Sequence, residues 1–234
     1  MKRLFLCPFS EWLAFFFLLN LACHLSGGIN PVSRLLPLFS LKEDGNFQID
    51  RYKDHTSDWS RTPDGHYYSN KAPGPTLLAT PIFWGMDEVI TWGQPTREER
   101  DETRIRHRVT YLKTFSYLLQ ILPFLGVVAF LIQWLLKGGI SRKAVLIGVL
   151  SLLLANTAAL KMSTFYGHGI TAVFALATGI AFWRGQWFWV GLFYGFATLS
   201  DYGMALMGLP LFVFALMRRS KFQTLVQFVG GGVL

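Results

Sequence analysis

Charged side chains and cysteines are both scarce in this chain. Only 15% of its 234 residues are Asp, Glu, Lys or Arg, whereas 52% are hydrophobic. Soluble domains usually carry about 25% charged residues, so this composition excludes an ordinary soluble domain. The two cysteines, Cys7 and Cys23, lie in or beside the first apolar segment, so no disulfide framework is indicated.

The sequence also lacks the common motifs of metal and nucleotide sites. It contains no CxxC or HExxH motif and no nucleotide-binding loop. We therefore predict no cofactor and no metal-ligating residues, while dependence on a divalent metal stays an open question.

Positive charge is in excess, since 22 basic residues against 14 acidic ones give a net charge of +8. The basic residues do not gather on one polar face. They punctuate apolar runs, which is the pattern of membrane topology. We expect membrane lipids, and no nucleic acid, among the partners.

Acidic residues are almost confined to one stretch. Residues 30–113 hold twelve of the fourteen, which leaves only Glu11 and Asp201 elsewhere. The same stretch is rich in proline and glycine, so we expect a shaped loop that carries any chemistry.

Apolar runs occupy most of the remaining chain. The first could be a cleaved signal peptide or an uncleaved membrane helix, and the last long run is divided by Ser200-Asp201-Tyr202-Gly203. The expected fold is all-α: a polytopic membrane protein with about six transmembrane helices and a large first external loop. A seventh helix starting near Phe222 would be truncated at Leu234, as in a fragment of a longer protein. The expected spans are residues 12–25, 115–136, 144–160, 165–183, and two short helices within 187–217.

The distribution of Lys and Arg predicts the orientation. With six spans and a cytoplasmic N-terminus, the short cytoplasmic segments hold nine basic residues and the short external turns hold only Lys161. We therefore expect residues 1–234 to form a single domain in the cytoplasmic (inner) membrane, crossing it several times, with residues 30–113 as its external loop.

Within this loop, three segments are expected to be helical. Arg34–Leu41 and Pro75–Ile90 are apolar, interrupted by prolines and too short to span, so we expect interfacial helices. Thr96 and Glu99 form a capping-box pattern at the start of a charged helix, which we expect to be solvated.

A dense group of polar residues lies in the middle of the loop. Its members could deprotonate an acceptor or hold a phosphate leaving group, which suits an enzyme that acts on a lipid-linked substrate. The group is Asp44, Asp50, Arg51, Tyr52, Asp54, His66, Tyr67, Tyr68 and Lys71.

The order of these residues resembles a known family. Asp50-Arg51-Tyr52, then Asp58-Trp59, then a Tyr-x-x-Lys-x-Pro pattern at residues 68–73 resemble the first external loop of the GT-C superfamily of membrane glycosyltransferases. The aromatic-small-His pattern at residues 165–168 is similar to that superfamily as well. The likeness extends to the protein O-mannosyltransferases and the lipid A aminoarabinose transferases. Ala-Pro-Gly at 72–74 departs from the Pro-Pro that relatives often have.

This resemblance implies a hexosyl- or pentosyltransferase that takes its sugar from a polyprenyl phosphate. The acceptor would be a glycan, a lipid or a protein on the external face of the membrane, and a fragment could be inactive. The resemblance implies Asp50 as the catalytic carboxylate, with Asp44, Asp54 and Asp201 as alternatives. Lys71, Arg51 and Tyr68 would bind the donor phosphate, and His66 and His168 would be accessory.

Each of these residues also has a structural interpretation. Asp50 could be an ordinary loop acid, Lys71 an interfacial lysine beside the tyrosines, and His168 a capping histidine. Asp201 interrupts an apolar run, which is costly inside a membrane but ordinary in an external turn. The alternative functions are a transporter or lipid-flipping component and a non-catalytic assembly subunit.

Overall fold

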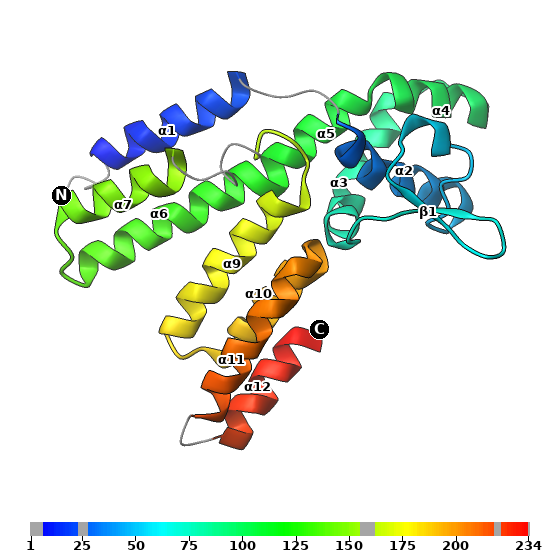
Figure 1. Cartoon of the computed structure of the whole chain (residues 1–234). Helices are drawn as coiled ribbons and strands as arrows, with labels where there is room; N and C mark the ends of the chain where they lie inside the picture. The colour runs from blue at the N-terminus through cyan, green and yellow to red at the C-terminus, as the bar shows by residue number, and fades with distance from the viewer. Residues whose placement is uncertain (1–6, 23–27, 155–161, 218–220, 234) are drawn as a thin grey trace.

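The computed structural model describes residues 7–22, 28–154, 162–217 and 221–233 (Figure 1). Its regular elements, in chain order, are α1 (Cys7–Ala22), α2 (Ile29–Asp44), the 3-10 turn η1 (Lys53–His55), β1 (Trp59–Arg61), β2 (Tyr67–Ser69), α3 (Gly74–Ile90), α4 (Arg97–Arg106), α5 (Arg108–Ser116), the π-helix η2 (Tyr117–Ile121), α6 (Leu122–Lys137), α7 (Arg142–Leu154), α9 (Gly167–Trp183), α10 (Trp187–Ser200), the 3-10 helix η3 (Tyr202–Met207), α11 (Gly208–Leu216) and α12 (Lys221–Val233).

The chain is helical, as expected, but the expectation of about six membrane-spanning helices is wrong. Only one helix of the described residues, Arg108–Lys137, is long and apolar enough to cross a membrane by length and composition. Its 30 residues would span about 45 Å at 1.5 Å per residue. The other apolar runs fold into shorter helices: α9 has 17 residues and α10 has 14. About 20 residues are needed to cross a bilayer, so these helices are too short.

Parts of the sequence-based topology lie outside the described residues. These parts include Cys23 with its neighbours at 24–27, the end of the expected span at 155–160, Lys161, and the basic residues Arg218 and Arg219. The predicted division of the last apolar run is present, because α10 ends at Ser200 and η3 begins at Tyr202.

The single long helix is continuous from α5 through η2 to α6 (Figure 1). Pro123 lies one residue inside α6 and has no N–H to donate to the preceding turn. The chain widens to a π-helix over Tyr117–Ile121 immediately before it, a distortion that accommodates such a residue inside a long helix.

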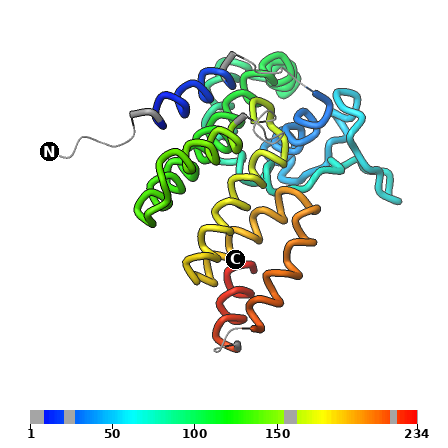
Figure 2. Tube along the Cα trace, turned by 60° about the vertical axis from the view of Figure 1, so that its left-hand side comes forward, coloured from blue at the N-terminus to red at the C-terminus, as the bar shows by residue number. Residues whose placement is uncertain are grey.

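Residues 28–107 form a polar lobe at one end of this long helix (Figures 1 and 2). Its core is apolar and consists of the inner faces of α2 and α3 packed on α5. Phe39 is fully buried there, with its ring 5.5 to 6.1 Å from those of Tyr52, Phe83 and Tyr111. Because its apolar face is inside the core, α2 is not the interfacial helix that its sequence predicted.

Local signals define the ends of the lobe's helices. Gly45 ends α2 in the left-handed conformation, with φ of 67°, which glycine adopts without steric cost. Pro75 occupies the first turn of α3, where a missing N–H is harmless. The predicted capping box is confirmed at α4, since Thr96 accepts from the Glu99 amide while Glu99 accepts from the Thr96 amide.

The helices outside the lobe form two further apolar clusters. One joins α1, α6 and α7 with the start of α9, around Phe16, Phe124 and Val128. The other joins the end of α9 with α10, α11 and α12, around Trp187 and Val190. Figure 1 shows α9 between the two groups, so this helix connects both clusters.

Helices α10 and α12 pack with unusually close backbones. Gly191 and Gly195 of α10, spaced as in a GxxxG motif, face Phe228 and Gly232 of α12. A Cβ atom built on Gly191 would overlap the carbonyl oxygen of Phe228. Small residues at this spacing let two helices approach closely, and the sequence-based interpretation did not recognise this motif.

Candidate functional site

The candidate site lies where the polar lobe meets the first turn of α9 and the last turn of α10 (Figures 1 and 2). We call this region the junction, and define it by Arg34, Lys71, Gly167, His168 and Asp201.

Arg34 is the buried cation of the junction, with 6% of its surface exposed. Its Nη1 donates to the carbonyl of Ala72 at 2.9 Å and its Nε to the side chain of Asn30 at 3.3 Å. Burial lowers the pKa of Arg34, while the negative charges of Asp201 and Asp58 act in the opposite direction. Two acids from separate parts of the chain therefore lie within electrostatic reach of one guanidinium.

His168 and Asp201 form a direct pair across α9 and the end of α10. Their Nδ1 and Oδ2 atoms are 2.5 Å apart, and the other carboxylate oxygen of Asp201 accepts the amide of Gly203 at 3.1 Å. Since a carboxylate only accepts, we assign the shared proton to Nδ1 of His168. In the neutral ring, Nε2 is the nitrogen that carries the lone pair, on a side chain that is 54% exposed. A histidine held in one tautomer by a carboxylate is suited to act as a general base.

Two glycines allow the three helices to meet at the junction. A Cβ atom on Gly74 would come within 2.6 Å of the Leu199 carbonyl oxygen. A Cβ on Gly167 would overlap the Ser200 carbonyl and lie 3.0 Å from Nη2 of Arg34. The absence of side chains here lets the lobe contact α9 and α10 directly and brings Arg34 beside the turn that carries His168.

Lys71 and Tyr68, both predicted to bind phosphate, line one hollow of about 140 Å³ on the lobe. The ammonium group of Lys71 is 3.1 Å from Oδ1 of Asp58. The hydroxyl of Tyr68 accepts from Gln48 at 3.1 Å. Asp58 is also one of the two acids that act on Arg34, so Lys71 and Arg34 lie near a common carboxylate.

Asp50, the predicted catalytic carboxylate, lies on the β1–β2 hairpin side of the lobe. Its Oδ2 is 2.7 Å from Nδ1 of His66, and its Oδ1 accepts the amide of Tyr67 at 2.6 Å. The hydrogen bond with His66 lowers the pKa of Asp50, and the same bond raises that of His66. Asp50 and His66 thus form a pair that ties residue 50 to β2, and no interaction among the described residues joins this pair to Arg34 or Lys71.

The remaining predicted residues lie elsewhere on the lobe. Both carboxylate oxygens of Asp44 accept from Arg97 at 2.6 Å. Arg51 pairs with Glu98 at 3.3 Å and lines a separate hollow of about 510 Å³. Asp54 is exposed on η1.

Helix α4 has the expected solvated face, at Glu98, Glu99 and Glu102, but its opposite face carries a buried ion pair. Arg104 and Asp87 are both fully buried and bonded by two contacts of 2.9 and 2.7 Å. Burial alone would raise the pKa of Asp87, but hydrogen bonds from Arg104 and Tyr111 outweigh it and the pKa is lowered. Hydrogen bonds from Arg100 and then Arg104 lower the pKa of Glu43 to about 2. These pairs hold α4 against α2 and α3.

Sequence reasoning did not select Arg34 of the junction as a site residue, nor Asp58, the carboxylate that pairs with Lys71. Arg34 stands in an otherwise apolar run. A charged side chain at such a position is rarely buried without partners, so its place in the run is the signal that could have identified it. Its partners come from residues 30, 72 and 201, so the pattern within one segment could not identify them.

No group of three or more His, Cys, Asp or Glu side chains is placed to hold a metal ion within the described parts of the chain. Neither a family model, nor a characterised protein, nor a solved structure matches this chain. The resemblance to the GT-C superfamily thus rests on the residues quoted for it.

Proposed function

We propose that this protein transfers a sugar from a polyprenyl phosphate to an acceptor hydroxyl, and that the junction is its active site. The observation that carries the proposal is the His168–Asp201 pair beside the buried Arg34. A base and a cation are the two groups that glycosyl transfer from a phosphate donor requires.

The four junction residues with functional side chains each have a defined part in the proposed reaction. Nε2 of His168 takes the proton of the acceptor hydroxyl, while Asp201 orients the ring and stabilises the resulting imidazolium. The acceptor oxygen forms a bond to the anomeric carbon as the bond from that carbon to the phosphate oxygen breaks, with inversion. The phosphate leaves with the electron pair, and Lys71 and Arg34 stabilise its charge.

The choice of base differs from the one that the family resemblance implies. His168 and Asp201 share the junction with a cation, whereas Asp50 is engaged by His66 and by a backbone amide. Asp50 then has a structural part in the hairpin, and we include it in the experiment as the alternative acid.

We propose the cytoplasmic membrane as the site of action. Large apolar side chains are exposed on the helices beyond the lobe, including Trp183 at 76%, Leu206 at 83% and Leu209 at 70%. Extended apolar surface of this kind marks contact with a membrane or another protein. Residues 108–137 are the candidate for crossing the bilayer.

The test is sugar transfer from labelled polyprenyl-phosphate hexose and pentose into the lipid, glycan and protein fractions of membranes that contain the full chain. Replacing His168 by Ala should reduce transfer about a hundredfold or more. Lys71→Met should reduce it about ten- to a hundredfold, because a charge-assisted phosphate contact is lost. The matched controls are His107→Ala and Lys113→Met, since both side chains are exposed on the neighbouring α4–α5 segment.

Two results would overturn this assignment. If Asp50→Asn abolishes transfer while His168→Ala does not, the base is Asp50 and the junction is not the catalytic centre. If no donor supports transfer but polyprenyl phosphate crosses the membrane, the protein is a transporter of the lipid.

A further inference from the structure

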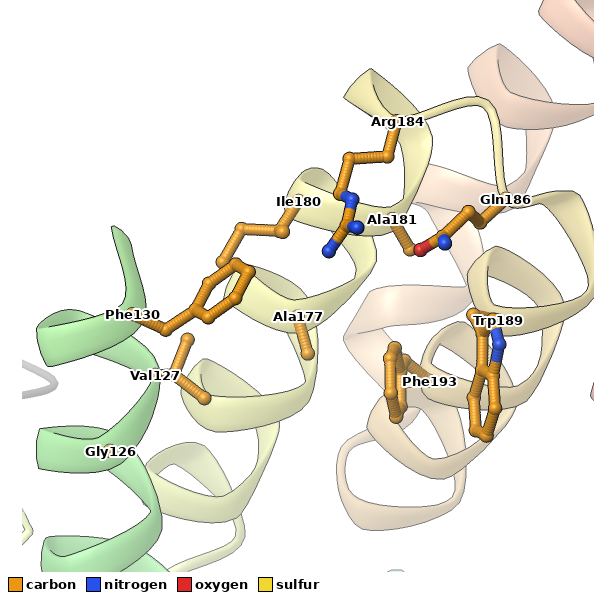
Figure 3. A pocket seen from close by; sticks show the side chains of 10 residues that line it. All are labelled: Gly126, Val127, Phe130, Ala177, Ile180, Ala181, Arg184, Gln186, Trp189 and Phe193. Atoms are coloured by element: carbon orange, nitrogen blue, oxygen red, sulfur yellow. The ribbon is translucent and has the colours of Figure 1, made fainter. Parts of the chain in front are cut away.

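A groove lies between α6, α9 and α10, at the end of α9 opposite the junction. Figure 3 shows its floor on α9 and its two walls on α6 and α10. Its volume is about 340 Å³, which is in the range of small-ligand sites. Its lining is largely apolar and includes Val127, Phe130, Ala177, Ile180, Trp189 and Phe193.

One cation stands at the end of this groove. The guanidinium of Arg184 lies over the ring of Phe130, 5.9 Å from its centre, and points along the groove rather than away from it (Figure 3). Arg184 has no carboxylate partner among the described residues, and the sequence has no Asp or Glu between Glu102 and Asp201.

Further positive charge lies at the same end of the bundle. The rings of Trp134 and Trp183 are 6.1 Å apart, which brings the end of α6 beside the end of α9. Lys137 therefore lies at the same end as Arg184, and Arg142 follows it at the start of α7. An apolar groove that ends at cations with no carboxylate partner in the described parts of the chain is complementary to a molecule with a hydrocarbon chain and an anionic head.

We infer that the groove binds an anionic phospholipid, with one acyl chain along α9 and the headgroup phosphate at Arg184. This site is distinct from the proposed site of sugar transfer. His168 and Arg184 are 16 positions apart along α9, which is about 24 Å at 1.5 Å per residue. The phosphate at Arg184 therefore belongs to a second lipid, and the inference does not depend on the proposed function.

The first test counts phospholipids retained by the full chain in native mass spectrometry, from micelles doped with phosphatidylglycerol or with phosphatidylcholine. The wild type should retain phosphatidylglycerol in preference. Arg184→Gln should reduce that preference about fivefold, the factor expected for one cation near an anionic headgroup. The control Lys113→Gln should leave it unchanged, because Lys113 is exposed on α5, away from the groove.

A second pair of variants tests the acyl-chain part of the site without changing charge. Gly126 lines the groove and Gly179 does not, and added side chains at both positions would meet open space. Gly126→Leu should fill the groove and abolish retention, whereas Gly179→Leu should not. The inference is overturned if phosphatidylcholine is retained equally well, or if Gly126→Leu binds phosphatidylglycerol like the wild type.

Discussion

The strength of the Asp50–His66 interaction should depend on pH. The raised pKa of His66 means that its contribution to stability is fully present below its ordinary value of 6.5 and is lost as pH rises through the raised value. The lowered pKa of Asp50 means that its contribution is present above 3.8 and is lost as pH falls through the lowered value. The interaction between Asp50 and His66, which joins residue 50 to β2, should therefore be strongest between about pH 3.8 and pH 6.5.

We predict that the amide of Tyr67, which donates to Asp50, is best protected from hydrogen exchange between about pH 4 and pH 6.5, after correction for intrinsic exchange rates. Protection should decline at pH 8.5. His66→Gln should remove this decline, while His55→Gln, at an exposed position of η1, should keep it. A flat profile in the wild type would show that the pair does not hold the hairpin.

The junction contains a second His–Asp pair, formed by His168 and Asp201, in a different environment. His168 also meets a carboxylate through Nδ1, but its pair lies beside the buried Arg34, whereas the Asp50–His66 pair lies at the hairpin. Two His–Asp pairs in one chain therefore have different parts: one joins local segments, and the other faces the groups that we propose to bind phosphate.

At the scale of elements, glycine positions decide which helices can meet. In α12, a Cβ on Gly231 would overlap the carbonyl of Phe188 in α10, whereas one on Gly230 would meet open space. The two residues are neighbours in one helix and differ only in the direction they face.

We predict opposite effects for the same substitution at these two sites. Gly231→Ala should lower the free energy of unfolding by about 1–3 kcal/mol, because it overpacks the α10–α12 contact. Gly230→Ala should raise it by up to about 1 kcal/mol, because alanine favours the helix. Denaturant unfolding of the purified protein measures both, and equal effects would mean that α10 and α12 do not pack at this close distance.

The ends of a helix were easier to predict from the sequence than the contacts that its side chains make. The capping box at Thr96 and Glu99 was correct because its signal is contained within four residues. The solvated face expected for the same helix is present at Glu98, Glu99 and Glu102. The burial of Arg104 against Asp87, which lies 17 positions away in α3, was not expected. Local pattern fixes where α4 begins, but only tertiary packing decides which of its charges are buried.

At the scale of the whole molecule, the number of spans was the main error. Apolar composition alone does not distinguish a membrane span from a shorter apolar helix, and the runs read as spans form shorter helices that pack on one another at residues such as Val190 and Ala181. The grouping of Lys71 with Tyr68 could be predicted because they are three residues apart. The approach of Arg34 to Asp201 could not, because it depends on how the lobe docks on α9 and α10.

The account depends most on a polyprenyl phosphate binding at the junction, and photolabelling measures this directly. A polyprenyl phosphate with a diazirine next to the phosphate would be irradiated with the full chain in micelles, and the labelled peptides mapped. We predict labelling of residues 66–77 and 165–171, competed by unlabelled polyprenyl phosphate and not by polyprenol, and reduced by Lys71→Met. Labelling confined to residues 51–55 and 97–106, which line the separate hollow at Arg51, would contradict the account, as would equal competition by polyprenol.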